Sequence, residues 1–126
     1  MSTKKNALTP YKIFDGIVMS ANRESIPTNI NWLDNVGIVL SFTGTPQGHF
    51  EVQVSNDYQP AQMPNSVPVN AGTWITVPLD NIPVAGGVDD TVAIDLNQLP
   101  FQWVKVVYVR SSGTGTLNGQ IVSKSV

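Results

Sequence analysis

Hydrophobic and polar residues alternate along much of this chain with a period of two. The clearest example is residues 48–55 (G-H-F-E-V-Q-V-S), in which Phe50, Val52 and Val54 alternate with polar side chains. Such alternation is typical of a β-strand that buries one face and exposes the other. The 3.6-residue period of an amphipathic helix is nearly absent. The pattern therefore predicts an all-β protein.

The same alternation, together with runs of β-branched residues, predicts six further strands. We expect them at residues 11–20, 36–42, 73–79, 91–96, 101–110 and 116–124. The fifth of these is apolar on both faces, which indicates a central strand. Residues 26–33 leave room for one helical turn. About seven to eight short strands predict an antiparallel two-sheet β-sandwich, jelly-roll-like or Greek-key.

Glycine and proline mark the connections between the predicted strands. Residues 43–48 (T-G-T-P-Q-G) and 111–115 (S-S-G-T-G) are short, and each predicts a hairpin turn. Residues 56–71 and 80–90 are longer and contain proline. Long loops of this kind in a compact domain commonly carry a function or an interface.

The length of 126 residues fits a single domain. We expect a flexible N-terminal arm at residues 1–10 and one β-sandwich domain at residues 11–126. The alternative is an arm that becomes ordered against a neighbouring subunit. The arm lacks the apolar run of a secretory signal, and no stretch approaches the roughly 20 apolar residues of a membrane span.

Composition and charge exclude several classes of function. Seven basic and nine acidic residues give a net charge of −2, without a basic cluster, which argues against a nucleic-acid partner. The absence of cysteine excludes disulfides, thiol catalysis and cysteine-based zinc sites. The single histidine, His49, falls on the polar side of its predicted strand. No serine lies in a G-x-S-x-G motif, and residues 113–115 do not lead into a helix that would bind phosphate.

Acidic residues near the predicted strand ends are the remaining candidates for chemistry. Paired carboxylates serve glycoside hydrolysis, and carboxylate oxygens bind Ca²⁺. Asp89 and Asp90, however, lack the D-x-D-x-D spacing of a calcium loop, and solvated loop acids are the simpler interpretation. We therefore predict no enzymatic activity, no metal and no cofactor.

The candidate ligand or interface residues lie in the two long loops. They are Asp57, Tyr58, Asp89 and Asp90. Tyr58 is the aromatic residue best placed for exposure, and an exposed ring beside acidic side chains suits a sugar. Trp74 and Trp103 fall within predicted strands, so we expect them to pack in the core.

Four segments of the chain resemble small virion proteins of bacteriophages. These are G-x-F-x-V-Q-V-S-N-D (48–57), A-G-T-W (71–74), I-D-L-N-Q-L-P-F (94–101) and V-K-V-V-Y-V-R-S-S-G-T-G-T-L-N (104–118). The resemblance covers roughly residues 34–124 and implies a β-sandwich component of a capsid or tail without enzymatic activity. The Q-V-S-N-D segment followed by a tryptophan-bearing strand is also similar to discoidin-like, galactose-binding sandwiches.

Two functions follow as expectations. The first is a virion structural protein, either capsid-associated (a decoration or minor capsid protein) or a small head or tail subunit. Such a protein would form a homo-oligomer or pack against major capsid or tail proteins. The alternative is a carbohydrate-binding module for host attachment, with a host glycan as ligand. The low charge and the absence of catalytic motifs suit either function.

Overall fold

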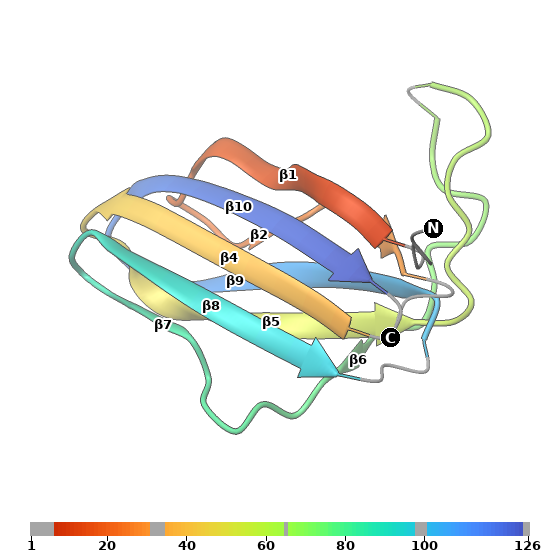
Figure 1. Cartoon of the computed structure of the whole chain (residues 1–126). Coiled ribbons are helices and arrows are strands. Elements are labelled where there is room, and N and C mark those ends of the chain that lie inside the picture. The colour runs from red at the N-terminus through yellow and green to blue at the C-terminus, as the bar shows by residue number, and fades with distance from the viewer. Residues whose placement is uncertain (1–6, 31–34, 65, 98–100, 125–126) are drawn as a thin grey trace.

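The computed structural model describes residues 7–30, 35–64, 66–97 and 101–124, and these residues form strands, turns and loops without a helix (Figure 1). The strands are β1 (Ala7–Val18), β2 (Arg23–Glu24), β3 (Thr28–Asn29), β4 (Asn35–Gly44), β5 (Gln47–Ser55), β6 (Ile75–Thr76), β7 (Val84–Gly86), β8 (Asp90–Asn97), β9 (Trp103–Ser112) and β10 (Gly115–Lys124).

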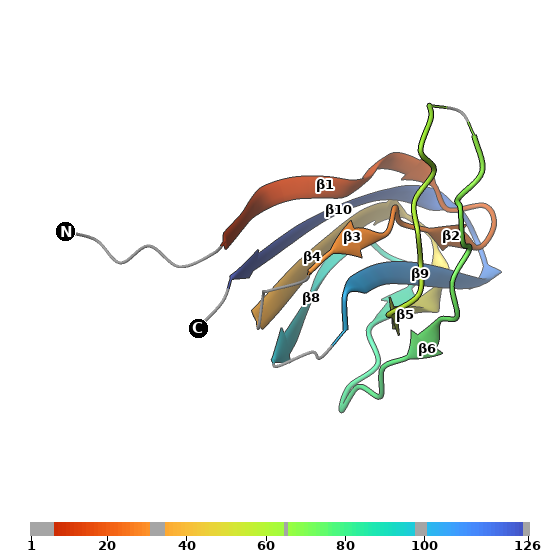
Figure 2. The same ribbon diagram turned by 90° about the vertical axis from the view of Figure 1, so that its right-hand side faces the viewer.

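Two antiparallel sheets pack face to face, which confirms the predicted β-sandwich (Figures 1 and 2). Sheet A has the order β1-β10-β4-β8. Sheet B has the order β2-β9-β5-β6, with β3 also paired to β9 and β7 also paired to β5. The long strands therefore occupy all of sheet A and the centre of sheet B, whereas short strands form both edges of sheet B.

The hydrophobic core lies between the sheets and follows the alternation in the sequence. In β5, Phe50, Val52 and Val54 are buried, as predicted. The ring of Phe50 packs between those of Phe42 and Tyr108, with centroid separations of 5.8 Å and 5.1 Å. The phenol of Tyr108 is buried and donates to the backbone oxygen of Gln47 (3.1 Å), and this burial raises its pKa above the usual 10.0. Sequence periodicity thus places the core correctly.

Three of the predicted segments differ from the structure. The strand expected at 73–79 is reduced to β6, which contains only Ile75 and Thr76. In the described part of 26–33, the two-residue strand β3 (Thr28–Asn29) stands in place of the predicted helical turn. β1 begins at Ala7, so the predicted arm overlaps β1 by residues 7–10, and residues 1–6 lie outside the described part of the chain.

The two short turns are not hairpins, which corrects the prediction. β4 belongs to sheet A and β5 to sheet B, and the same change of sheet separates β9 from β10. The turns pack against each other instead, since the N–H of Thr45 donates to the oxygen of Thr114 (2.9 Å). A Cβ at Gly113, where φ is +73°, would overlap the oxygen of Thr45. Glycine is needed there because two chain crossings meet at one end of the sandwich.

The two edge strands of sheet A differ in regularity. The pairing of β1 with β10 has three register shifts, and around one of them the neighbours Ile13 and Phe14 are both buried. The pairing of β8 with β4 runs from Asp90 to Asn97 without a shift. β1 is therefore a bulged edge, and β8 is a straight one.

Candidate functional site

The predicted site residues lie at opposite ends of the sandwich. Asp57 and Tyr58 follow the last residue of β5, whereas Asp89 and Asp90 precede or begin β8, near the first residues of β5. The nine residues of β5 separate the two ends by roughly 30 Å, at about 3.3 Å per residue. The four residues therefore belong to two regions rather than to one site.

At the first region, the Asp57 carboxylate holds the ends of a long loop together. Its Oδ1 accepts hydrogen bonds from the Ser55 hydroxyl (2.8 Å) and from the Thr73 backbone N–H (2.7 Å). These donors, Thr73 first, lower the pKa of Asp57 below 3.8. A carboxylate with these contacts ties residue 57 to residue 73 and closes the intervening loop.

The buried Ser55 fixes the chain direction where this loop begins. Its Oγ accepts from the backbone N–H groups of Asp57 (3.3 Å) and Tyr58 (3.2 Å). Gly72 lies against this turn with φ +84°, and a Cβ there would stand 3.0 Å from two carbon atoms of Tyr58. The position of the Tyr58 ring thus depends on the Ser55 hydroxyl and on the absence of a side chain at Gly72.

Tyr58, Trp74 and Trp103 form an aromatic cluster on the outer surface of sheet B. The Tyr58 ring lies 4.9 Å from that of Trp103, edge to face, and 5.6 Å from that of Trp74. All three residues are half-buried, so the prediction that both tryptophans pack in the core is wrong. Trp103 alternates with the buried Val104, so it points away from the core.

A lysine and a glutamate border the aromatic cluster. The Lys105 ammonium lies 4.4 Å from the centre of the Trp74 ring and 2.7 Å from Oε1 of Glu24. The Trp74 indole N–H donates to the oxygen of Ala71 (2.9 Å), which attaches it to the loop. The cluster is therefore a patch of packed rings with one cation over a ring face. Sequence reasoning missed Lys105 and Glu24 because their strands are far apart in the chain.

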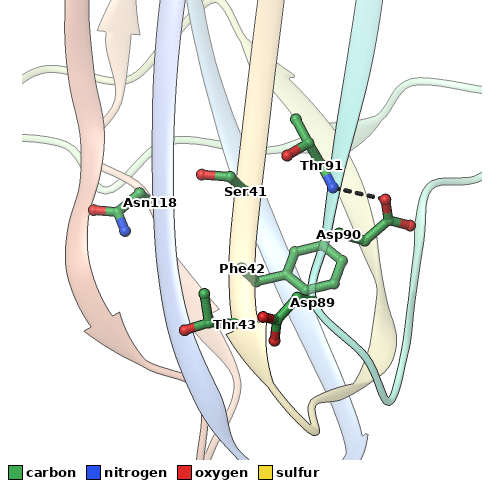
Figure 3. Close-up of a pocket in the computed structure, with 7 residues that line it drawn as sticks. All are labelled: Ser41, Phe42, Thr43, Asp89, Asp90, Thr91 and Asn118. Atoms are coloured by element: carbon green, nitrogen blue, oxygen red, sulfur yellow. Dashed lines mark hydrogen bonds between the residues drawn. The ribbon is translucent and has the colours of Figure 1, made fainter.

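The second region surrounds Asp89 and Asp90 (Figure 3). A hollow of about 430 Å³ is lined by Ser41, Phe42, Thr43, Asp89, Asp90, Thr91 and Asn118. Asp89 Oδ1 accepts from the N–H of Gly44, and Asp90 Oδ1 accepts from the N–H of Thr91, both at 2.8 Å. Both carboxylates thus serve turn geometry. No group of three or more metal-ligating side chains occurs among the described residues.

A third feature, which the sequence did not predict, is an apolar groove between β5 and residues 76–82. It encloses about 250 Å³ and is lined by His49, Phe50, Glu51, Thr76, Val77, Pro78, Leu79 and Ile82. His49 Nε2 lies 2.9 Å from Glu51 Oε2, and both side chains are partly exposed. Val77 and Leu79 fall within the strand predicted at 73–79, and both pack against the core.

Neither the family models nor the curated proteins searched give a match to the chain. Three solved structures are similar to it in fold. They are the SPBc2 prophage-derived protein YomS (11% identity, 98% of each chain, TM-score 0.48), chitosan-binding module 1 of a chitosanase/glucanase from Paenibacillus sp. IK-5 (20% identity, 90% of this chain and 75% of that one, TM-score 0.44) and a protein of the disulfide-linked pili that form Bacillus endospore appendages (14% identity, 98% and 92%, TM-score 0.41). The function therefore has to be argued from the residues of the chain itself.

Proposed function

We propose that the chain is a non-enzymatic structural subunit of a virion, either capsid-associated or a small head or tail component, that packs against other virion proteins. The observation that carries this proposal is the nearly uncharged outer face formed by β4, β8 and β10 in sheet A. Charged residues are depleted at the centre of protein–protein interfaces, although such interfaces are no more apolar overall than other protein surface.

The outer face of β4, β8 and β10 is built from small and uncharged side chains. The outward residues whose side chains the structure describes are Asn35, Gly37, Val39, Ser41, Thr43, Thr91, Ala93, Asp95, Thr116, Asn118, Gln120 and Val122. Asp95 is the single charged side chain among them. Val39 and Val122 are 47% and 44% exposed. A broad face of this composition is suited to contact with protein.

The two long loops and the strand order lend further support. Large apolar side chains are exposed in both loops: Met63, Val67, Val69, Ile82 and Val88. When β2 with β3, and β6 with β7, are each counted as one broken strand, the sandwich has two four-stranded sheets in the manner of a jelly roll. Jelly rolls occur in viral capsid proteins and also in lectins, so this argument is one of analogy.

The presence or absence of the protein in purified virus particles tests the proposal. Mass spectrometry of particles purified from the virus or host that encodes the chain should detect it at many copies per particle. Its density in a reconstruction of the particle should place the outer face of sheet A against another protein. Absence of the chain from purified particles would overturn the proposal.

A carbohydrate-binding module is the second candidate, because the aromatic cluster offers three partly exposed rings beside Lys105 and Glu24. A glycan array followed by calorimetric titration tests it. Binding that is lost in Tyr58→Ala but kept in Val109→Ala, on the same face of β9, would support this function. Absence of binding to any glycan on the array would exclude a general sugar-binding role.

A further inference from the structure

We propose that the free edge of β8 accepts residues 1–6 of a neighbouring copy of the chain as an additional antiparallel or parallel strand. The inference rests on the proposed function as an assembly subunit, and it names the partner and the contact. An added strand gains affinity from backbone hydrogen bonds along a sheet edge, and side chains on alternate positions provide specificity.

The edge of β8 is long, regular and open. Within the described residues β8 pairs only with β4, and Figure 1 shows it at the margin of sheet A. Its eight residues, Asp90–Asn97, follow the register of β4 without a shift. A straight edge strand of this length presents a row of backbone donors and acceptors that soluble proteins usually protect.

The other edges of the two sheets are protected by known devices. β1 is interrupted by three register shifts and carries the exposed pair Lys12–Asp15 (3.4 Å). The edge strands of sheet B are only two or three residues long. Bulges, charges and short strands all prevent edge pairing. Among the described strands, β8 alone is a long edge without bulges.

Thr91 indicates which backbone groups of β8 point away from β4. Its N–H donates to the Asp90 carboxylate (2.8 Å), and Figure 3 shows this bond on the side of β8 away from β4. Because backbone groups of alternate residues in a strand point to opposite neighbours, Ala93 and Asp95 also direct their N–H and C=O groups outward. The outward groups of Ala93 lie in the middle of the edge, where an added strand would bond.

Charge complementarity favours residues 1–6 as the segment that binds the edge of β8. β8 and the residue before it carry Asp89, Asp90 and Asp95, whereas residues 1–6 (M-S-T-K-K-N) carry Lys4 and Lys5. Pairing of two β8 edges would instead bring the carboxylates of both copies together. Six extended residues span about 20 Å, which matches most of an eight-residue strand.

Residues 1–6 have to come from another copy, because β8 of their own copy is too far from the start of β1. In sheet A, β1 and a strand added beyond β8 would be four strand spacings apart, about 19 Å at roughly 4.8 Å each. Residues 1–6 would be fully used in crossing that distance, so these six residues could not also lie along β8 of their own copy. The contact is therefore head-to-tail between copies, a geometry that closes rings or propagates chains.

Ala93→Pro tests the edge, because proline removes the outward N–H and leaves the bonds between β8 and β4 in place. We expect sedimentation equilibrium of the full chain to give at least about tenfold weaker self-association, with an unchanged circular dichroism spectrum. Ala93→Val, which keeps the N–H, is the matched control and should associate like the unmodified chain. Equal association of Ala93→Pro and the unmodified chain would overturn the inference.

A charge exchange tests the occupant. Lys4→Glu with Lys5→Glu should weaken association several-fold, and adding Asp95→Lys to that variant should restore it. Failure of Lys4→Glu/Lys5→Glu to weaken association would remove the arm from the β8 edge. A chain that stays monomeric at millimolar concentration would also overturn the inference. Neither result affects the proposed function, since that depends on finding the chain in purified particles.

Discussion

Asp57 illustrates, at the scale of a single residue, how a carboxylate stabilises the loop that it closes. Its pKa is lowered by the Thr73 N–H and the Ser55 hydroxyl, so the folded state favours the ionised form more than the unfolded state does. The resulting stabilisation is complete above the unfolded pKa of about 3.8 and is lost as the pH falls through the lower folded value.

Asp57→Asn should therefore lower the free energy of unfolding at pH 7 and have a smaller effect below pH 3. Urea unfolding of the variant and of the unmodified chain at pH 7, 5, 4 and 2.5 measures the difference. Asp80→Asn, at an exposed loop position, is the control and should leave stability unchanged. A difference between Asp57→Asn and the unmodified chain that stays constant with pH would contradict the assigned role of the carboxylate.

Gly72 is the second residue on which the position of Tyr58 depends. Gly72→Ala would force a Cβ to within 3.0 Å of Tyr58 at a φ of +84°, so we expect the free energy of unfolding to fall by about 1–3 kcal/mol. Gly86→Ala is the control, because its Cβ would meet no atom within 4 Å. Thermal unfolding of both variants tests this. Equal stability would show that the loop adapts without cost.

Sequence reasoning at this scale identified loop residues but not their partners. Asp57 and Tyr58 were found because they follow an evident strand. Their contacts with Thr73, Trp74 and Trp103 depend on how the chain returns after residue 70, and local patterns do not encode that return. Trp103 was assigned to the core because β9 is apolar on both faces, yet its ring packs against the loop on the outer side.

At the scale of elements, the aromatic cluster fastens the long loop 56–74 to sheet B. Figures 1 and 2 show this loop projecting beyond the sandwich, and among its described residues one β-bridge, Gln59 with Asn70, joins its two sides. The rings of Tyr58 and Trp74 attach the two ends of the loop to Trp103 and to each other. Packing between rings contributes about 0.5–1.5 kcal/mol per pair beyond the area that it buries.

Trp103→Ala should release the loop while the sandwich stays folded. We expect the free energy of unfolding to fall by about 2 kcal/mol and the amides of Gln59 and Asn70, which bond to each other's backbone oxygens, to exchange hydrogen faster. Hydrogen exchange measured by NMR reports both amides. Val109→Ala, on the same face of β9, should leave their exchange rates unchanged. Unchanged exchange in Trp103→Ala would mean that the cluster does not hold the loop.

The long strands were predictable, and the short ones were not, for a physical reason. β4, β5, β8 and β10 alternate because one face of each meets the core. Two-residue strands such as β2 and β6 form only where a passing segment meets β9 or β5, so their existence depends on tertiary contacts. The short turns after β4 and β9 were misassigned as hairpins because a brief glycine-rich link is equally suited to crossing between sheets.

At the scale of the whole molecule, the two outer faces are chemically different. Sheet B carries the aromatic cluster at one end, and the apolar groove runs beside β5. The outer face of β4, β8 and β10 in sheet A bears, among its described residues, the single charge of Asp95 and the exposed Val39 and Val122. The described residues contain no helix able to cross a lipid bilayer. A weakly charged face of this kind is suited to contact with another protein, as the proposed function requires.

Val39 lies near the middle of that face, with Ala93 and Gln120 as its cross-strand neighbours. Because Val39 is 47% exposed, Val39→Glu should change the free energy of unfolding of the isolated chain by less than about 1 kcal/mol. A carboxylate buried without a partner in an interface is costly, so incorporation into particles should fall several-fold.

Competition between tagged Val39→Glu and the unmodified chain during particle assembly, read by quantitative mass spectrometry, measures this fall. Ala21→Glu, at an exposed position between β1 and β2, adds the same charge away from the outer face of β4, β8 and β10 and from both long loops, and should be incorporated normally. Equal incorporation of Val39→Glu and the unmodified chain would exclude the outer face of sheet A as the contact. The loops at 56–74 and 80–90, with their exposed apolar side chains, would then be the surface to test.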